Sequence, residues 1–201
     1  MTRQRALILA TAWIVSACGT SGATRPAPIQ VHGDAGFTIT ERARVSGSAR
    51  GDFEDALRLL EQEQYEKGIA LLVEVTEAAP ELTAPHIDLG IAYRLVGDLE
   101  RAEQSLARAI ELDPRHPAAH NEMGIVYRRT GRFAEARRSY QTALAEYPSF
   151  HFARRNLAIL CDVYLADPAC ALEHYELYSR SVPDDEAAAM WIADLRARSG
   201  R

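Results

Sequence analysis

The sequence has almost no lysine: Lys67 is the only one among 201 residues, and the other basic residues are arginines. This bias is typical of genome composition rather than of a particular chemistry. A single lysine excludes most serine–lysine catalytic pairs, and the Gly-x-Ser-x-Gly turn that presents a nucleophilic serine is also missing. Lys67-Gly68 does not form a phosphate-binding loop, because no Gly-x4-Gly precedes it. These absences predict a protein that is not an enzyme and needs no cofactor.

The charge balance has the wrong sign for a nucleic-acid-binding protein. The 28 acidic residues outnumber the 23 basic ones, for a formal net charge of −5. Residues 1–17 contain Arg3 and Arg5 but no acid, so removal of this segment would make the remainder more negative. Proteins that bind nucleic acids are expected to carry a basic face. We therefore expect no nucleic-acid partner.

A pattern of small, large and turn residues recurs with a step of 34 residues. The third copy contains Met123-Gly124, Tyr127, Gly131, Phe133, Ala136, Tyr140, Ala143 and Pro148. The second contains Leu89-Gly90, Tyr93, Gly97, Leu99, Ala102, Leu106, Ala109 and Pro114. The first contains Ala56, Leu59, Tyr65, Gly68, Leu72, Val75 and Pro80. The fourth contains Leu157-Ala158, Cys161 and then, shifted slightly, Ala171, Tyr175, Tyr178 and Pro183.

This order resembles the tetratricopeptide repeat, a helix–turn–helix unit of 34 residues. The resemblance implies an all-α fold, namely an α-solenoid of four such repeats followed by a capping helix. Small residues let the two antiparallel helices of a repeat approach closely, and large residues fill the gaps to the next repeat. One pair of short helices cannot bury enough apolar area to offset its ordering entropy, so the repeats must stack. A bundle of unrelated amphipathic helices is the alternative, but it would not give a fixed step.

The repeats are expected over residues 52–183. The predicted helix pairs are 53–63 with 66–78, 84–96 with 99–112, 117–130 with 133–146, and 151–165 with 168–181. Asp52 is the predicted N-cap of the first helix, and each pair ends at a proline, which cannot continue a helix. Residues 184–201 are the predicted capping helix. Its apolar face is formed by Ala188, Trp191, Ile192 and Leu195. Trp191 could instead be a ligand-binding ring, but we favour core packing.

The histidines do not predict a metal site. His116 and His120 are four residues apart, a spacing that can place two ligands on one helix face. His116 precedes Pro117 and is therefore expected outside the helix, and no acidic or cysteine cluster is near in sequence. His86 and His120 occupy the same place in successive repeats, where a large residue normally packs. We expect no bound metal.

The N-terminus resembles an export signal. Residues 1–5 are basic and residues 6–17 form an apolar run of 12 residues, too short to span a bilayer comfortably. The run leads into Val15-Ser16-Ala17-Cys18, which resembles the lipobox of bacterial lipoproteins and implies cleavage after the alanine and acylation of Cys18. Several acyl chains anchor a protein far more stably than one. The alternative is an ordinary signal peptide with an incidental cysteine. Gly19 implies, for a Gram-negative source, the periplasmic face of the outer membrane.

Residues 18–51 are predicted to be the lipidated cysteine and a flexible tether, because they are rich in glycine, serine, alanine and proline. A coil of this length would hold the domain about 30 Å from the membrane. Within it, residues 37–40 (FTIT), Ala43 and Val45 alternate like a strand. Such a lone strand could lie against the first repeat or wait for the sheet edge of a partner. Disorder is the interpretation that we favour.

The remaining cysteines, Cys161 and Cys170, both fall in the fourth repeat. Cys161 takes the place of Tyr93 and Tyr127 in earlier repeats, and Cys170 lies near the start of the second helix. In the resembled architecture these two positions pack against each other, and an exported protein meets an oxidising compartment. A disulfide would clamp this repeat, which lacks the turn glycine of the two before it. Two buried thiols are the alternative, and the shifted register leaves the geometry open.

The first helix of each pair lines a concave groove in tetratricopeptide repeat proteins, and exposed residues there hold a partner peptide. The resemblance implies a groove with an aliphatic column, flanked by arginines and more polar toward the last repeats. The partner-binding candidates are Phe53, Leu57, Ile87, Ile91, Arg94, Asn121, Ile125, Arg128, Arg155 and Ile159. The alternative is that the aliphatic column only completes the inner packing, and that Arg94 and Arg128 pair with nearby glutamates.

The expected partner differs from that of the chaperone-binding members of the family, which clamp a C-terminal carboxylate with lysines and asparagines. Isoleucine stands where the asparagines of that clamp would be, and the groove has no lysine; Asn121 alone does not carry the function over. We therefore expect an extended or helical protein segment with apolar side chains and some acidic character.

The whole plan resembles the small proteobacterial tetratricopeptide lipoproteins of the cell envelope. One kind is encoded alongside TonB/ExbB/ExbD energy-transducing systems, and another, pilotin-like, serves type IV pilus or secretin assembly; the tail from Asn156 onward is closer to the first. The resemblance implies a lipid-anchored periplasmic adaptor that binds a component of an envelope complex. The alternative is an adaptor or regulator of a periplasmic protease or cell-wall hydrolase, and glycan binding is a third possibility. The repeats specify a scaffold and not a ligand.

Overall fold

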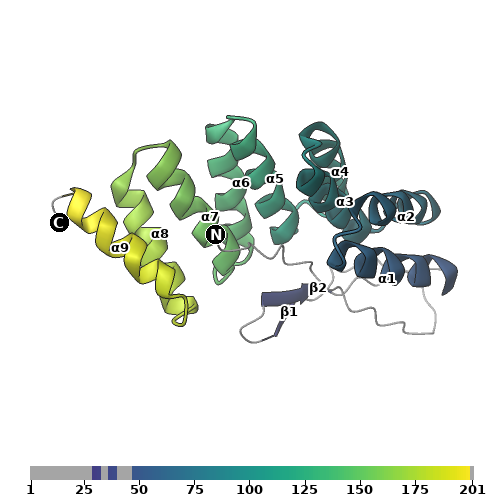
Figure 1. Cartoon of the computed structure of the whole chain (residues 1–201), viewed down its shortest axis with the longest axis horizontal. Coiled ribbons are helices and arrows are strands. Elements are labelled where there is room, and N and C mark those ends of the chain that lie inside the picture. Colours follow the sequence, from purple (N-terminus) through teal and green to yellow (C-terminus); the bar gives the residue numbers. More distant parts are fainter. Residues whose placement is uncertain (1–28, 33–35, 40–46, 200–201) are drawn as a thin grey trace. The chain divides into compact units, whose positions relative to one another are not determined.

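The computed structural model describes residues 29–32, 36–39 and 47–199 (Figure 1). The predicted signal peptide, Cys18 and much of the predicted tether lie outside these residues. Internal packing divides the chain into an N-terminal module, residues 1–112, and a C-terminal module, residues 113–201. In the described part of the chain, no helix has both the length and the apolar character needed to cross a membrane.

The N-terminal module holds the first two repeats as antiparallel helix pairs. α1 (Gly47–Glu61) packs against α2 (Tyr65–Ala78), and α3 (Thr83–Val96) packs against α4 (Leu99–Leu112). Contacts between α2 and α3 join the two pairs. A short antiparallel hairpin, β1 (Ile29–His32) and β2 (Gly36–Ile39), precedes them in the chain.

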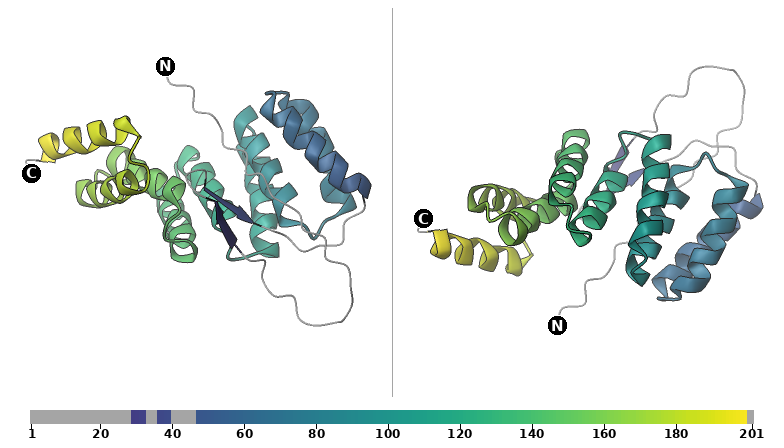
Figure 2. Two further views of the ribbon diagram at one scale, coloured as in Figure 1. Left: turned by 90° about the horizontal axis from the view of Figure 1, so that it is seen from below. Right: turned by 90° about the horizontal axis from the view of Figure 1, so that it is seen from above.

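The C-terminal module holds the last two repeats and the capping helix. α5 (Pro117–Arg129) pairs with α6 (Phe133–Glu146). α7 (His151–Ile159) continues into a π-helical turn, η2 (Leu160–Tyr164), and pairs with α8 (Pro168–Ser181). α9 (Glu186–Ser199) packs against α8 (Figure 2). The predicted all-α repeat architecture is confirmed, and the predicted bounds of α4, α6 and α8 agree with the observed ones.

Two expectations about the start of the folded chain are wrong. The segment that alternates like a strand does have a partner, because Phe37 pairs with Val31 and Ile39 with Ile29 across the hairpin. The partner strand is only four residues long, too short to stand out in the sequence. The first helix begins at Gly47 rather than after Asp52. Its additional turn buries Ala49, which gives this turn a packing reason to form.

Small residues hold the helices of each pair close together, as the repeat pattern predicts. A Cβ atom added to Gly90 would lie 2.6 Å from Cγ of Leu106, and one added to Gly124 would lie 2.5 Å from the Tyr140 ring. Both distances are far below van der Waals contact, so only glycine fits at these positions without a shift of the neighbour. Gly124 thus fixes the separation of α5 and α6.

The slight shift of the fourth repeat has a structural cause in η2. A π-helical turn contains one residue more than an α-helical turn. Here the Leu165 amide donates to the Leu160 carbonyl at 3.1 Å, five residues back, and the Asp167 amide donates to the Cys161 carbonyl at 2.9 Å. The additional residue is absorbed inside the helix, so that α8 starts one position late but packs as the second helices of the other repeats do.

One equivalent position in three successive repeats binds a proline carbonyl across the turn between repeats. Nε2 of His86 lies 3.4 Å from the Pro80 carbonyl oxygen, and Nε2 of His120 lies 2.8 Å from that of Pro114. Arg154 donates to the Pro148 carbonyl in the same way. Each side chain satisfies an oxygen six residues earlier, just after the preceding helix has ended. This repeat position was expected only to pack a large side chain, and it therefore also stabilises the turn that follows the preceding helix.

His116 is the buried N-cap of α5. Its Nδ1 accepts a hydrogen bond from the Ala119 amide at 3.4 Å, at the start of α5, with Pro117 in the first helical turn. Burial, and next the charge of His120, lower the pKa of His116 to about 3. The folded protein therefore keeps this imidazole neutral down to acidic pH.

The neutral His116 predicts a pH-dependent stability. The unfolded chain binds a proton at this histidine below about pH 6.5, whereas the folded chain does not do so until about pH 3. The free energy of unfolding should therefore fall as the pH falls between these values, by at most about 1.4 kcal/mol per pH unit, and this contribution should be constant above pH 6.5. Urea unfolding at pH 7.5 and 5.0 measures it. His116→Asn keeps a capping oxygen without a titrating group, so parallel pH profiles of the variant and the wild type would contradict the assignment.

Candidate functional site

The predicted groove residues of the N-terminal module divide into buried and accessible ones. Phe53, Ile87 and Ile91 are only 1%, 3% and 3% exposed. Leu57 and Arg94 are partly exposed. The burial of the first three favours the alternative in which the aliphatic column completes the packing, because side chains without accessible surface offer no contact area to a partner. This half of the predicted aliphatic surface is core in the structure.

The groove residues of the C-terminal module form a more polar surface. Ile125 and Ile159 are half-buried and pack on the core cluster around Tyr140, Leu157 and Tyr175. Asn121 is buried, and its Oδ1 accepts a hydrogen bond from Nδ2 of Asn156 at 2.9 Å. This amide pair joins α5 to α7. Asn121 is thereby engaged in linking two repeats, a role that the sequence did not indicate.

Arg128 and Arg155 are groove residues whose guanidinium groups are not fully hydrogen-bonded. The guanidinium carbon of Arg128 lies 5.7 Å from the centre of the Tyr164 ring, and that of Arg155 lies 5.8 Å from the Tyr178 ring. Nε of each arginine is buried and has no hydrogen-bond acceptor. Burial, followed by the hydrogen bond to Asp185, raises the pKa of Tyr178. Both guanidinium groups are thus held by aromatic rings, and neither Nε is satisfied.

Asp162, which takes the place of Arg94 and Arg128 in the fourth repeat, is already paired. Its carboxylate accepts from Arg198 of α9 at 3.0 Å and lies 3.5 Å from the Tyr175 hydroxyl. Burial and then the Asp162 charge raise the pKa of Tyr175 to about 12. The Trp191 ring lies 5.5 Å from that of Tyr175 and packs on the core, as predicted. These contacts fasten the capping helix to the last repeat.

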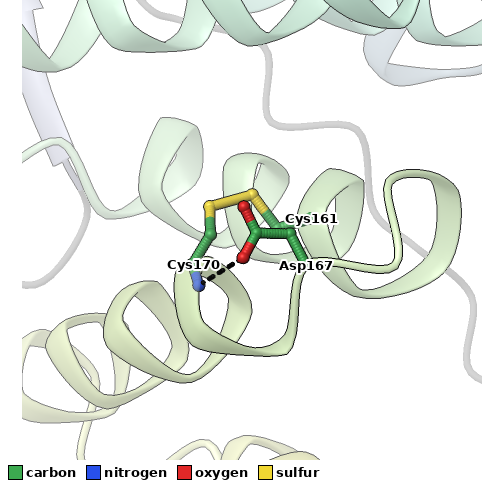
Figure 3. A group of neighbouring side chains, drawn as sticks. All are labelled: Cys161, Asp167 and Cys170. Carbon is green, nitrogen blue, oxygen red and sulfur yellow. Dashed lines mark hydrogen bonds between the residues drawn. A yellow bond between two sulfur atoms is a disulfide. The ribbon is translucent and has the colours of Figure 1, made fainter.

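Cys161 and Cys170 form a disulfide, with their Cα atoms 5.9 Å apart (Figure 3). Asp167 lies beside it and caps α8, because its Oδ1 accepts from the Cys170 amide at 3.1 Å. Its other oxygen is 3.4 Å from Arg137 of α6. Within the described ranges, these two cysteines and Asp167 are the only group with metal-ligand geometry. Because the sulfurs are bonded to each other and the carboxylate is a helix cap, we assign the group a structural role.

A surface of Arg128, Phe133, Val163 and Tyr164 was not expected from the sequence, and we call it the η2 surface. Val163 and Tyr164 are 65% and 43% exposed. The Tyr164 ring lies 5.0 Å from the Phe133 ring and beneath the Arg128 guanidinium. In the third repeat the equivalents of Val163 and Tyr164 are the polar Arg129 and Thr130. The signal available in the sequence was this change from polar to apolar residues at the end of one first helix.

Comparison with known proteins identifies the repeat. Models of the tetratricopeptide repeat match residues 48–123 and 87–160. No curated protein sequence matches the chain. The fold is similar to that of pilF from Pseudomonas aeruginosa, with a TM-score of 0.70 at 21% identity, over 76% of this chain and 69% of that one. It is also similar to MamA, residues 41 to the end, from Desulfovibrio magneticus RS-1, with a TM-score of 0.68 at 18% identity, over 78% and 88% of the two chains.

A third solved structure holds a peptide. The first tetratricopeptide domain of Spaghetti (RPAP3), bound to the HSP90 peptide SRMEEVD, matches with a TM-score of 0.57 at 20% identity, over 61% of this chain and 97% of that one. At these identities the likenesses establish the fold alone. Together with the repeat models and the helix pairs, they show that residues 48–160 consist of tetratricopeptide repeats and that the chain is a protein of this repeat family.

Proposed function

We propose that the chain is a lipid-anchored periplasmic adaptor on the outer membrane that binds a segment of a partner protein and thereby supports an envelope assembly, such as TonB-type transport, a pilus or a secretion system. The repeat architecture supports the protein-binding part, because such repeats form interaction scaffolds and a solved relative holds a peptide. The residues Val15-Ser16-Ala17-Cys18 support the anchor. The choice of envelope system rests on the sequence resemblance.

The observation that carries the proposal is a pair of half-buried arginines, Arg128 and Arg155, in the C-terminal module. A buried N–H without an acceptor is costly, so native proteins leave few of them. Nε of Arg128 and Nε of Arg155 are two such groups, on the first helices of successive repeats. A partner segment cannot reach a nitrogen without accessible surface, so its carboxylate would bind the accessible part of these two side chains. Because arginine binds carboxylates most strongly, the partner segment is expected to be acidic.

Charge reversal at these two positions tests the proposal. Crosslinking in native membranes and capture of the full chain should recover a partner from wild type, and Arg128→Glu/Arg155→Glu should reduce its yield at least tenfold, because two attractive contacts become repulsive. Arg138→Glu/Arg180→Glu is the matched control, since these two exposed arginines lie on second helices and carry the same charge change.

The outcomes separate the candidate functions. Loss of a component of an envelope machine in the groove variant alone supports the adaptor, and loss of a protease or cell-wall hydrolase supports the alternative. Equal yields from wild type and both variants would contradict binding at the two arginines. Cys18→Ser measured by membrane fractionation tests the anchor: the variant should move to the soluble fraction, and its retention after a high-salt wash would argue against lipidation.

A further inference from the structure

The η2 surface holds two of the three strongly exposed large apolar side chains that the structure describes in the C-terminal module. Val163 and Tyr164 are side by side in the chain, both exposed, and the Tyr164 ring is backed by Phe133. Among the described residues, Met190 on α9 is the other strongly exposed large apolar side chain of this module, and it stands apart in the chain. Contiguous exposed apolar side chains on a soluble protein commonly mark an interaction site.

The geometry of η2 explains why these side chains face outward. In a continuous α-helix each residue advances by about 100° around the axis, so one additional residue rotates everything after it. The π turn ends at Tyr164, and the Asp167 cap with the Cys161–Cys170 disulfide holds the chain immediately after it. The side chains of Val163 and Tyr164 are therefore presented by a fixed backbone. A partner would not need to order this segment on binding, which favours affinity.

Arg128 brings a positive charge to the η2 surface, although the protein as a whole is acidic. Arg128 lies in the last turn of α5. Among the residues that the structure describes, no carboxylate forms an ion pair with Arg128, and its Nε is buried without an acceptor. Two acids next to η2 in the sequence are paired elsewhere: Asp162 binds Arg198, and Asp167 binds Arg137. An anionic occupant would meet the positive charge of Arg128, which no described carboxylate pairs with.

We infer that the η2 surface docks an acidic segment of the partner protein that carries an apolar or aromatic side chain next to its carboxylates. The apolar side chain packs on Tyr164 and Val163, and a carboxylate binds the accessible part of the half-buried Arg128 side chain. This inference rests on the proposed function and deepens it, because it names where on the C-terminal module the segment ends and which chemistry selects it. The aromatic ring and the guanidinium act as one unit, since the cation lies over the ring that receives the apolar contact.

Selection from a random library of 12-residue displayed peptides, with the full soluble chain as bait, tests the inference. Selected peptides should be enriched in Asp or Glu adjacent to Leu, Phe, Trp or Tyr. A synthetic peptide of the selected sequence, followed by fluorescence anisotropy, should bind Val163→Ser and Tyr164→Ser at least tenfold more weakly than wild type, and Arg128→Gln likewise. Met190→Ser and Arg138→Gln, which remove an exposed apolar side chain and an arginine elsewhere in the module, should bind within twofold of wild type.

Failure of this inference can be distinguished from failure of the proposed function. Selected peptides that lack acidic residues, or that bind Val163→Ser as tightly as wild type, would overturn this inference and leave the proposed function in place. Absence of any selected peptide, together with no crosslinked partner in membranes, would overturn both. Binding of phosphatidylglycerol vesicles that is lost in the same variants, without peptide selection, would assign the surface to a membrane instead. Val163→Ser guards against a folding artefact, because this side chain is 65% exposed.

Discussion

Gly124→Val is expected to destabilise the C-terminal module by about 3 kcal/mol or more. Even a single Cβ at this position would lie 2.5 Å from a carbon of the Tyr140 ring, and valine adds two further methyl groups. The ring is fully buried and rigid, so it has no space into which to move. Relief of the overlap would require α5 and α6 to separate, with loss of the packing that joins the two helices. Guanidinium unfolding followed by circular dichroism at 222 nm measures the effect.

Gly51→Val is the matched control for this substitution. Gly51 also lies within a helix, α1, but a Cβ there would meet no atom within 4 Å. Valine has a somewhat better helix propensity than glycine, so the control should change the free energy of unfolding by no more than about 0.5 kcal/mol. Equal destabilisation by the two variants would contradict a cost that is specific to the close approach of α5 and α6.

Loss of the Cys161–Cys170 disulfide is the second large effect. Cys161→Ala/Cys170→Ala should lower the free energy of unfolding by about 2–3 kcal/mol, because the bond closes a short loop of the unfolded chain, nine residues in sequence separation. Alanine is the suitable replacement, since serine would bury an additional hydroxyl at the fully buried position 161. The unfolding midpoint of wild type in a thiol reductant should approach that of the variant, and the reductant should leave the variant unchanged.

The bond itself can be observed directly by mass spectrometry. Both cysteines fall in the tryptic peptide of residues 156–180, so a disulfide makes that peptide two hydrogens lighter without linking it to another. Recovery of the peptide with two alkylated thiols from non-reduced protein would contradict the disulfide. It would also mean that no disulfide restrains the segment that presents Val163 and Tyr164. The stability and peptide-binding experiments should therefore be made on the same sample.

The helices could be predicted from the sequence because their limits are set by local chemistry. Prolines stop each pair, and Gly97 and Gly131 adopt positive φ angles of 90° and 78° at the turns inside the second and third repeats. In the first and fourth repeats, Glu63 and Ala166 adopt the same left-handed conformation without being glycine. The turns at Glu63 and Ala166 follow from the packing of the flanking helices, and no residue with a preference for positive φ angles marks them in the sequence.

The candidate site was predicted only in part, because the exposure of a side chain depends on tertiary contacts, and the periodicity of the sequence does not show these contacts. The 34-residue step places Ile91 and Ile125 at equivalent positions, yet the first is buried and the second half-buried. It places Arg128 and Asp162 at equivalent positions, yet the first keeps an unsatisfied Nε and the second is bound by Arg198. In the second case the difference comes from the capping helix α9, which carries Arg198 and belongs to no full repeat.

Spacing and residue size along the chain were enough to predict the repeat, the order of its helices, most of their limits and the places where only a small residue fits. Only the tertiary structure decided which side of each first helix keeps accessible surface, which arginines lack an acceptor and where the inserted residue of the fourth repeat goes. The reason is physical: burial and hydrogen-bond satisfaction are properties of several elements packed together. The π turn that exposes Tyr164 forms because α7 and α8 must still pack in register around one additional residue.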